Sequence, residues 1–420
     1  MKITLLNSHD RAGGAARAAN RLHLALRDLG IDARMLVQIK QGDQASVIGP
    51  QTAAGLLTAN LRPAADLLPT LVYPRRTKAT FYPGWLPERM ARRVKAMQPD
   101  IVHLHWITGG ALNVRSLRKV GRPLVWTLHD MWAFTGGCHY DDGCGRFNNG
   151  CGRCPVLGSG SVFDLSRIGW RRKLRAYRNL TLRIVTPSRW LGEKVRDSAL
   201  LGRYPVSVIP NPIDTRLFRP IDRRLARDLL GLPPDRSIVL FGALRSTSDR
   251  RKGFGLLRPA LQEFGRTDRG RESCAVIFGA SRPDEAPDLG MDCIFMGTLA
   301  DDLSLCLLYC AADVLVAPST QENLSNTVME SLSCGTPAVT FRVGGMPDMV
   351  EHQVNGYLAQ PFESEDLARG IGWVLQDGRR HLALSASARA KVLEEFDQAK
   401  IARRYVALYE ETMQSAKERR

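Results

Sequence analysis

Two glutamates stand eight positions apart in the stretch QENLSNTVMESLSCGTPAVT (321–340). Glu322 follows a short apolar run, and Ser325 or Asn323 can cap a helix that begins just after it. The free amides of such a helix start, together with the helix dipole, suit a phosphate or diphosphate. Glu330 would lie about 6–9 Å further along the helix axis, where a carboxylate can accept two hydrogen bonds from a diol such as ribose. The spacing fits a nucleotide-sugar, and it fits equally well two surface acids with no common role.

Two segments of the chain alternate apolar runs with helical stretches, a pattern typical of doubly wound α/β domains with parallel sheets. In the first segment we predict a strand over 2–7, an amphipathic helix over 15–30, and further strands over 33–38, 100–106, 123–130, 183–188 and 206–211. In the second segment we predict strands over 237–243, 274–280, 293–298, 313–319 and 337–341.

At 420 residues the chain is long enough for two domains. We predict an N-terminal domain over 1–205, with a Cys-rich insertion at 136–155 and completed by a C-terminal helix over 396–420. The second domain is predicted over 206–395. Two open sheets joined by a hinge bring the carboxyl ends of their strands to facing edges, where ligands of such folds bind. We therefore expect the active site in a cleft between the domains.

Basic residues gather in the first half of the chain. Residues 1–204 hold 32 Lys and Arg against 13 Asp and Glu, whereas residues 205–420 hold 27 against 29. Two runs, 71–95 and 167–178, also interleave basic with aromatic residues, which suits an anionic bilayer surface. Single-stranded nucleic acid is an alternative partner for such runs, and so is an ordinary solvated basic face. We favour the membrane and expect no nucleic acid.

The overall composition, 44% hydrophobic and 24% charged, is typical of a globular protein. No uncharged apolar window of 18 residues exists, so we predict no membrane-spanning helix. The first apolar run is about five residues long, too short for a signal peptide. We expect a cytoplasmic protein, bound peripherally to the inner face of the cytoplasmic membrane.

Four of the nine cysteines fall within seventeen positions of a glycine-rich stretch: Cys138, Cys144, Cys151 and Cys154. Thiolates on tight turns suit tetrahedral zinc, and a reducing cytoplasm disfavours disulfides. We predict a structural zinc, while free thiols and disulfides stay open because the spacing is irregular. Four closed ligands would leave no open position for chemistry. The other cysteines lie in apolar stretches and are expected to be buried, inert thiols.

Six segments resemble, in the right order, those of family 4 glycosyltransferases with the GT-B fold. They are SHDRAGGAARAA (8–19), VIPNPIDTRLF (208–218), RKGFGLL (251–257), the E-x7-E region at 321–340, VGGMPDMVEHQVNGYL (343–358) and FDQAKIARRYVALYEE (396–411). Because these segments span nearly the whole chain, we identify the sequence as similar to this family. It is closest in character to bacterial enzymes that build colanic acid and other exopolysaccharides.

The resemblance implies a retaining transfer of a hexosyl group from a UDP- or GDP-sugar to a hydroxyl of a glycan, without a catalytic metal. The acceptor it suggests is carried on polyprenyl diphosphate. Glu322 would bind sugar hydroxyls and stabilise an oxocarbenium-like transition state, and Lys252 would neutralise the leaving diphosphate. His129 would lie near the sugar and the leaving phosphate. Without the resemblance, His129 reads as a core histidine at a strand end.

The resemblance also implies a set of donor-binding residues: Glu330 for the ribose, Arg251 for the diphosphate, Ser325, Asn326 and Thr327 at the helix start, and Gly13 and Gly14 in the first loop. The sequence departs from the family in a longer loop before Lys252, which leaves Arg245, Arg250 and Arg251 as rival second cations. Two other functions stay open, a GT-B nucleotide-sugar epimerase and a basic nucleic-acid-binding protein. Both glutamates on one helix start argue against a glycoside hydrolase, whose carboxylates flank one bond.

Overall fold

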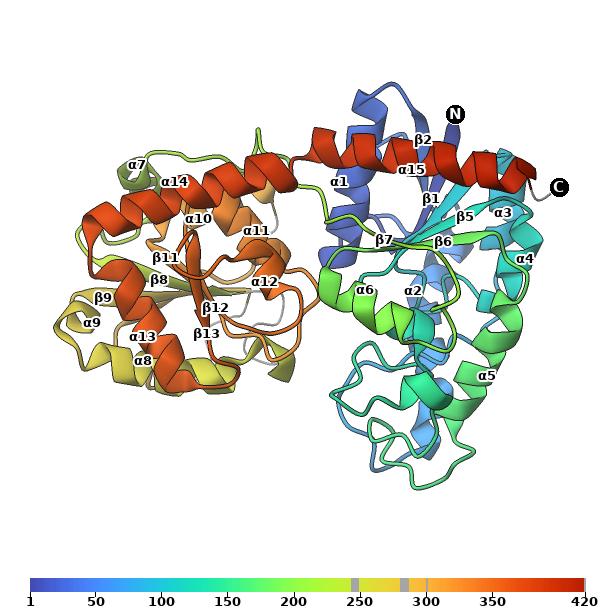
Figure 1. Cartoon of the computed structure of the whole chain (residues 1–420), viewed down its shortest axis with the longest axis horizontal. Helices are drawn as coiled ribbons and strands as arrows, with labels where there is room; N and C mark the ends of the chain where they lie inside the picture. The colour runs from blue at the N-terminus through green and yellow to red at the C-terminus, as the bar shows by residue number, and fades with distance from the viewer. Residues whose placement is uncertain (243–248, 280–286, 300, 419–420) are drawn as a thin grey trace. The chain divides into compact units, whose positions relative to one another are not determined.

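The computed structural model describes residues 1–242, 249–279, 287–299 and 301–418 (Figure 1). The chain divides into two compact units. Unit 1 comprises Met1–Pro212 and Ala399–Arg420, and unit 2 comprises Ile213–Gln398. Each unit holds one parallel sheet covered by helices, so the predicted α/β class with two doubly wound domains is confirmed.

The sheet of unit 1 has seven parallel strands in the order β3-β2-β1-β4-β5-β6-β7. The strands are β1 (Lys2–His9), β2 (Asp32–Ile39), β3 (Val47–Ile48), β4 (Ile101–Leu104), β5 (Leu124–Thr127), β6 (Leu182–Thr186) and β7 (Val206–Val208). Its α-helices are α1 (Gly14–Asp28), α2 (Ala53–Leu67), α3 (Met90–Met97), α4 (Leu117–Val120), α5 (Leu165–Tyr177), α6 (Arg189–Arg196) and α15 (Gln398–Glu418). All predicted strands of this segment are found, and β3 adds a short edge strand.

The sheet of unit 2 has six parallel strands in the order β10-β9-β8-β11-β12-β13. The strands are β8 (Ser237–Gly242), β9 (Ser273–Phe278), β10 (Cys293–Phe295), β11 (Val314–Ala317), β12 (Ala338–Phe341) and β13 (Gly356–Ala359). Its α-helices are α7 (Arg223–Leu230), α8 (Phe254–Gly265), α9 (Asp268–Arg271), α10 (Asp302–Ala311), α11 (Asn326–Ser333), α12 (Met346–Met349), α13 (Ser364–Leu375) and α14 (Gly378–Glu395). Alternate residues of β8 join two separate core clusters, so both faces of this sheet are buried.

The boundary between the units differs from the predicted 205/206. Val206–Val208 pairs in parallel with β6 and therefore belongs to the first sheet, which moves the boundary to 212/213. At the other end, Asp397 bridges to Ile213 and accepts a hydrogen bond of 2.6 Å from Thr215. These contacts keep residues up to 398 in unit 2, whereas we predicted 396 as the start of the returning helix.

The final helix completes the core of unit 1. Tyr405 and Tyr409 of α15 are 2% and 0% exposed and join the apolar cluster on one face of the sheet. The Tyr409 hydroxyl lies 2.7 Å from His103 Nδ1, and the Tyr405 hydroxyl lies 2.9 Å from Thr127 Oγ1. A segment distant in sequence is thus tied to β4 and β5 by buried polar contacts as well as by packing.

The aromatic residues of the two basic runs mostly pack inward, against our expectation of an aromatic and basic surface. Phe81 and Tyr177 are 2% and 0% exposed, and Trp170 donates to the Phe147 carbonyl at 3.1 Å. Lys173 is buried as well, and burial lowers its pKa to about 7. Helical spacing explains the difference, because the aromatic and basic residues of α5 that share one face are turned to the core.

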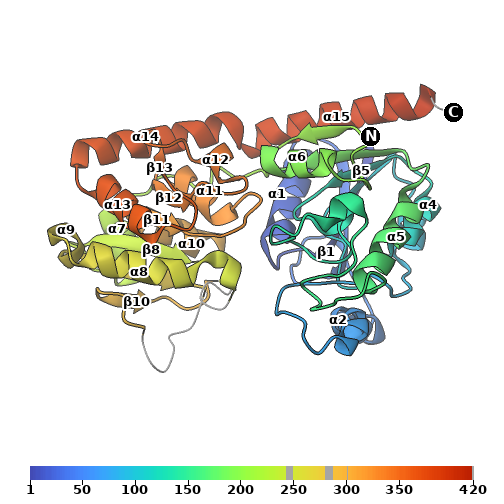
Figure 2. The ribbon, with the colours of Figure 1, turned by 60° about the horizontal axis from the view of Figure 1, so that its bottom comes forward.

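A different apolar surface is exposed on unit 1. Leu57, Leu61 and Leu68 recur at helical spacing along α2 and the 3-10 turn that follows it, and they are 63%, 57% and 54% exposed. Leu71 and Val72 extend this stripe with exposures of 66% and 73%. Figure 2 shows α2 at the lower margin of unit 1. We call these five side chains the α2 stripe.

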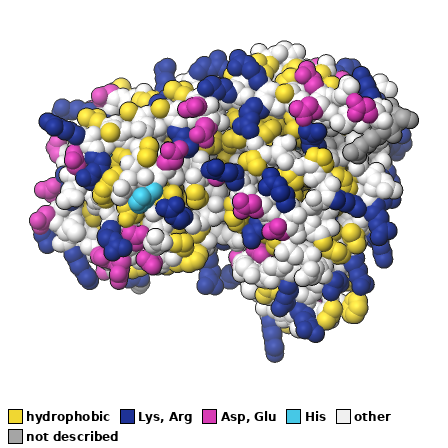
Figure 3. Space-filling model, in the orientation of Figure 1, with side chains coloured by type: hydrophobic (Ala, Val, Ile, Leu, Met, Phe, Trp, Pro, Cys, Tyr) yellow, Lys and Arg dark blue, Asp and Glu magenta, His cyan; other side chains and the backbone are white. Residues whose placement is uncertain are grey.

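Exposed cations follow the α2 stripe directly in the chain. Arg75, Arg76 and Lys78 are exposed. The face of unit 1 seen in Figure 3 likewise carries Lys and Arg side chains interspersed with hydrophobic ones. Among the described helices, none is both long and apolar enough to cross a bilayer.

Candidate functional site

Lys252 and Glu322 form a largely buried ion pair in unit 2, with 2.6 Å between Nζ and Oε2. Lys252 lies in a 3-10 turn (Arg250–Lys252) after β8, and Glu322 lies in the loop after β11. β8 and β11 are neighbouring parallel strands, so both loops lie at the carboxyl edge of the sheet. The structure therefore brings together two of the three catalytic residues that the sequence predicted.

Backbone packing fixes this pair in place. A Cβ on Gly253 would lie 1.8 Å from the Pro318 carbonyl oxygen, and a Cβ on Gly344 would lie 1.9 Å from that of Glu322. Both glycines also have positive φ, 75° and 55°, which other residues adopt at a cost. The Thr320 amide donates to the Arg251 carbonyl at 2.8 Å. Glycine at both positions lets three loops press backbone against backbone.

The charge on Glu322 is set by its neighbours. Burial by itself raises the pKa of this carboxyl, but the Lys252 ammonium, then Arg251 and the Asn323 amide, outweigh it and leave the pKa below its usual value. The carboxylate is therefore ionised at neutral pH. Of the three candidate arginines, Arg251 carries a charge that lowers the pKa of Glu322. Its guanidinium also forms an ion pair of 2.8 Å with Asp249. Arg250 is exposed, and Arg245 lies outside the described residues.

The helix start of the E-x7-E region has the predicted cap. The Ser325 hydroxyl accepts from the Val328 amide at 3.4 Å and lies 2.9 Å from Thr327 Oγ1. Asn326 is the first residue of α11. Glu330 is only 1% exposed, and its Oε2 accepts a hydrogen bond of 2.9 Å from Tyr309 of α10. The alternative of a surface acid at position 330 is therefore wrong.

The predicted residues of unit 1 lie at the carboxyl edge of the first sheet. Gly13 caps α1 and Gly14 is its first residue, and a Cβ on Gly13 would meet no atom within 4 Å. His129 follows β5, and its Nε2 lies 3.0 Å from His105 Nδ1. Burial lowers the pKa of His129 to about 4, so its ring is neutral at pH 7. It is part of a row of rings with His105 and His103.

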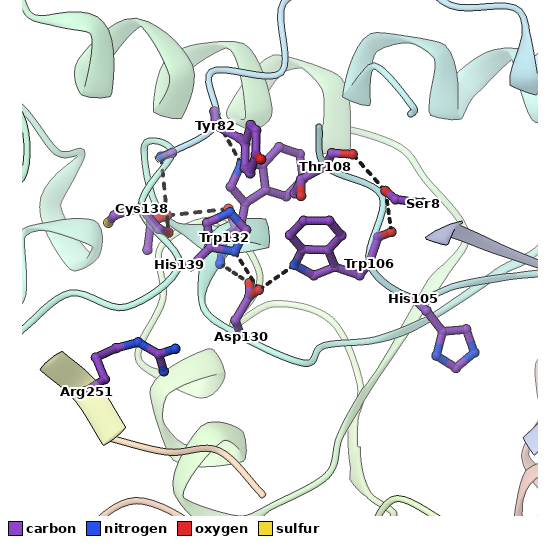
Figure 4. Close-up of polar contacts among 12 residues, drawn as sticks. Ser8, Tyr82, His105, Trp106, Thr108, Asp130, Trp132, Cys138, His139 and Arg251 are labelled. Carbon is purple, nitrogen blue, oxygen red and sulfur yellow. Dashed lines mark hydrogen bonds and ion pairs between the residues drawn. The ribbon is translucent and has the colours of Figure 1, made fainter. Parts of the chain in front are cut away.

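A polar cluster beside His129 was not predicted (Figure 4). Asp130 Oδ2 accepts from His139 Nδ1 at 2.6 Å and from the Trp106 indole at 2.8 Å, while Oδ1 accepts from the Trp132 amide at 2.8 Å. Burial raises the pKa of Asp130, but His139 and the other donors outweigh it and keep the pKa below its usual value. The position of an aspartate directly after His129 was the available signal in the sequence.

Three buried polar atoms near this cluster have no partner within the part of the chain that the structure describes. They are His105 Nε2, Thr108 Oγ1 and His139 Nε2. His105 and Thr108 also line a small pocket together with Trp106, His129 and Asp130. Because buried polar groups are normally hydrogen-bonded, this pocket suits a polar ligand or ordered water.

Two of the four clustered cysteines, Cys138 and Cys154, are buried in a small apolar core that includes Phe81. Cys144 and Cys151 are half-buried, and Cys151 packs against another core cluster of unit 1. Burial raises the pKa of all four thiols, and the nearby thiols raise that of Cys138 further. Throughout the described ranges, no three of these four sulfur atoms all lie within 4.8 Å of one another. The zinc site stays a prediction.

Solved structures of other proteins share the fold of this chain. Sucrose-phosphate synthase from Thermosynechococcus elongatus matches with a TM-score of 0.69 and 20% identity, over 99% of both chains. Anabaena HepE in complex with UDP and glucose matches with a TM-score of 0.66 and 20% identity, over 98% of this chain and 100% of that chain. The fold is the GT-B fold of glycosyltransferases.

The sequence comparisons narrow this class to a family. The family model described as Glycosyltransferase Family 4 matches residues 12–217, and the one described as Glycosyl transferases group 1 matches residues 235–377. An uncharacterized glycosyltransferase of Methanocaldococcus jannaschii is 32% identical over 75% of this chain and 76% of its own length. The chain belongs to glycosyltransferase family 4 and is a glycosyltransferase, which confirms the predicted resemblance to that family. The likeness to exopolysaccharide enzymes stays a prediction.

A further relative is named D-inositol 3-phosphate glycosyltransferase, from Acidothermus cellulolyticus. It is 31% identical over 75% of this chain, and the match spans 65% of the relative's own length.

The ion pair leads to a pH-dependent stability prediction. Lys252→Ala should lower the free energy of unfolding of unit 2 by about 1–3 kcal/mol at pH 7, because it leaves a buried carboxylate without its nearest cation. The pKa of Glu322 is depressed in the folded state, so the pair stabilises above the unfolded pKa of about 4.3. This stabilisation is lost as pH falls through the folded pKa. Urea unfolding of both proteins from pH 7 down to well below the unfolded pKa of about 4.3 would measure it.

Two controls sharpen this measurement. Lys391→Ala removes a lysine whose partners, Glu351 and Glu395, are about half exposed, and it should cost under about 1 kcal/mol. In a double-mutant cycle, Glu322→Gln should cost much less once Lys252 is Ala. Additive effects of the two substitutions would contradict the coupling between Lys252 and Glu322.

Proposed function

We propose that this glycosyltransferase moves a hexosyl group, with retention of configuration, from a nucleotide-diphosphate sugar to a hydroxyl of a glycan acceptor. The Lys252–Glu322 pair is the observation that carries the proposal. The reaction develops positive charge at the sugar and negative charge on the leaving diphosphate, and a fixed carboxylate beside a fixed cation is complementary to both. The Lys252 ammonium has three N–H donors, so it can contact Glu322 and the diphosphate together.

The neutral state of His129 also supports this proposal. With a pKa near 4, the imidazole adds no cation close to the oxocarbenium-like centre at neutral pH. It can still offer one N–H to a sugar hydroxyl. We propose no catalytic metal, and retention is proposed from the family resemblance.

We propose that Glu330 binds the ribose of the donor. Tyr309 holds its carboxylate in one orientation, and a fixed orientation favours a paired contact with two hydroxyls. The base is proposed as uracil or guanine. The solved complex of HepE with UDP and glucose supports uracil.

We further propose an anionic membrane surface as a partner of unit 1, and a polyprenyl-diphosphate-linked glycan as the acceptor, in synthesis of a cell-surface polysaccharide. The α2 stripe and the cations at 75, 76 and 78 support peripheral binding, since apolar side chains next to basic ones suit an anionic interface. A small phosphorylated polyol is the rival acceptor, because relatives are named for D-inositol 3-phosphate. Activity on a water-soluble acceptor without vesicles would favour the polyol.

We also propose that Cys138, Cys144, Cys151 and Cys154 hold a structural zinc, because four thiols match its preferred donors. The sulfur atoms must come closer together than they stand here. Metal analysis should find one zinc that is lost in Cys138→Ser and kept in Cys274→Ser. Full zinc content in Cys138→Ser, or no zinc in the wild type, would contradict the site.

The donor proposal predicts nucleotide-dependent thermal stabilisation. UDP or GDP should raise the melting temperature of the wild type, and Glu330→Ala should lose this shift because the ribose contact is gone. Glu322→Gln should keep the shift yet lower kcat by about 10²–10³, as expected for loss of an electrostatic contact to the transition state. Glu272→Ala, an exposed glutamate of unit 2, is the matched control.

Three outcomes would redirect the proposal. No shift with any nucleoside diphosphate would favour a nucleic-acid-binding protein, whose binding falls steeply with salt. An altered free sugar formed without an acceptor would favour an epimerase. Unchanged kcat in Glu322→Gln would remove this residue from catalysis.

The membrane proposal predicts that Leu57→Ser/Leu61→Ser lowers binding to vesicles of anionic phospholipid about tenfold or more, from the apolar area no longer buried. Co-sedimentation at low and high salt would measure this. Leu225→Ser/Leu229→Ser is a matched control, because these α7 leucines are 51% and 63% exposed in unit 2. If both double variants lose vesicle binding equally, or if the wild type does not bind vesicles, the proposed role of the α2 stripe is contradicted.

A further inference from the structure

Three cysteines expected to be inert meet in the core of unit 2. Cys306 and Cys310 stand four residues apart on α10, and therefore on one helix face. Cys334 directly follows α11. Their sulfur atoms all lie within 4.8 Å of one another, and those of Cys306 and Cys334 are 3.7 Å apart. All three residues are buried, at 0–5% exposure. We call them the thiol triad.

The spacing of the thiol triad is close to that of a metal site. With metal–sulfur bonds of about 2.3 Å, three sulfur atoms around one ion stand about 4.0 Å apart. The 3.7 Å between the sulfur atoms of Cys306 and Cys334 is close to this value, and no pair of the three exceeds 4.8 Å. Side-chain adjustment alone could therefore bring the three sulfur atoms onto one ion.

The donor set selects a soft ion. Thiolates favour Cu(I) and zinc over the oxygen-seeking cations Mg²⁺ and Ca²⁺. Tetrahedral zinc needs a fourth ligand, and the group of mutually close ligand atoms found among the described residues contains three. Cu(I) accepts three sulfur ligands and fits best.

The groups around the thiol triad allow its thiols to become metal-bound thiolates. The Cys306 and Cys310 thiols now donate weakly to the Leu217 and Arg219 carbonyls, each at 3.3 Å. The guanidinium of Arg389 donates to the Ser333 carbonyl at 2.8 Å, one residue before Cys334. A fixed cation there offsets part of the negative charge of bound thiolates.

We propose that Cys306, Cys310 and Cys334 form a buried three-thiolate site for Cu(I). Each copper–sulfur bond replaces an S–H bond, so up to three protons leave to solvent. No electron is transferred.

The site would be coupled to the donor helix. Tyr309 lies between Cys306 and Cys310 and donates to Glu330, and the Cys334 amide donates to the Glu330 carbonyl at 3.1 Å. An ion that ties α10 to α11 should therefore change nucleotide affinity. This coupling rests on the proposed role of Glu330, whereas metal binding does not.

Competition with the Cu(I) chelator bathocuproine disulfonate tests the site in the reduced, full-length chain under anaerobic conditions. Cys306→Ser/Cys334→Ser should bind one equivalent of Cu(I) fewer than the wild type. Cys274→Ser, a buried cysteine of β9 outside the thiol triad, should bind as the wild type does. Cys138→Ser/Cys154→Ser shows how much Cu(I) the cysteines of unit 1 bind. If Cu(I) binding falls only in this variant, the proposal is overturned.

A second measurement needs no variant. The folded wild-type chain is alkylated over a time course with and without Cu(I), the reaction is quenched, and the labelled peptides are mapped by mass spectrometry. Cu(I) should protect Cys306, Cys310 and Cys334 together, and equal labelling would overturn the site. A mass lower by two hydrogens, with a cross-linked peptide that joins residues 306 and 334, would instead identify a Cys306–Cys334 disulfide and overturn the Cu(I) site. If Cu(I) leaves the affinity for UDP unchanged, the coupling between the metal site and the donor helix is contradicted. If the chain does not bind UDP at all, only the proposed function is contradicted, and the metal site still stands.

Discussion

The close approach of three backbone loops around the Lys252–Glu322 pair is the constraint on which the candidate site depends. A buried carboxylate is tolerated only with a partner, and the partner comes from a loop seventy positions earlier in the chain. Gly253 and Gly344 allow these loops to touch without side chains between them. The two charged side chains are therefore anchored by tightly packed loop backbone at the ends of parallel strands.

Unit 1 contributes a different kind of site. Its carboxyl edge carries the neutral rings of His105 and His129. Beside them, the ionised Asp130 accepts hydrogen bonds from His139 and from the Trp106 indole. Neutral rings beside a buried carboxylate suit binding of hydroxyl groups, whereas the cations of unit 2 suit phosphate. The two sheets differ in the chemistry they offer because different residues stand at the ends of their strands.

Much of the fold could be predicted, because apolar runs of buried parallel strands are distinctive and family motifs fix their order. Glu322, Lys252 and the Ser325 cap could be predicted for the same reason. The buried state of Glu330 could not, since it depends on Tyr309 from another helix. Nor could the Asp130–His139 contact, which joins residues nine positions apart, or the thiol triad, whose third member follows a separate helix. The burial of Lys173 and Tyr177 in α5 was not predicted, because the many basic residues of this helix are typical of an exposed one.

The placement of α15 has a consequence for biosynthesis. Tyr405 and Tyr409 fill a core whose other walls are made by residues before 210. During translation, the part of this core that α15 fills must therefore stay open until the whole of unit 2 and residues beyond 398 have left the ribosome. Unit 2 has all its strands in one continuous segment and can fold first. The two units would then be completed on the ribosome in the reverse of their order of synthesis.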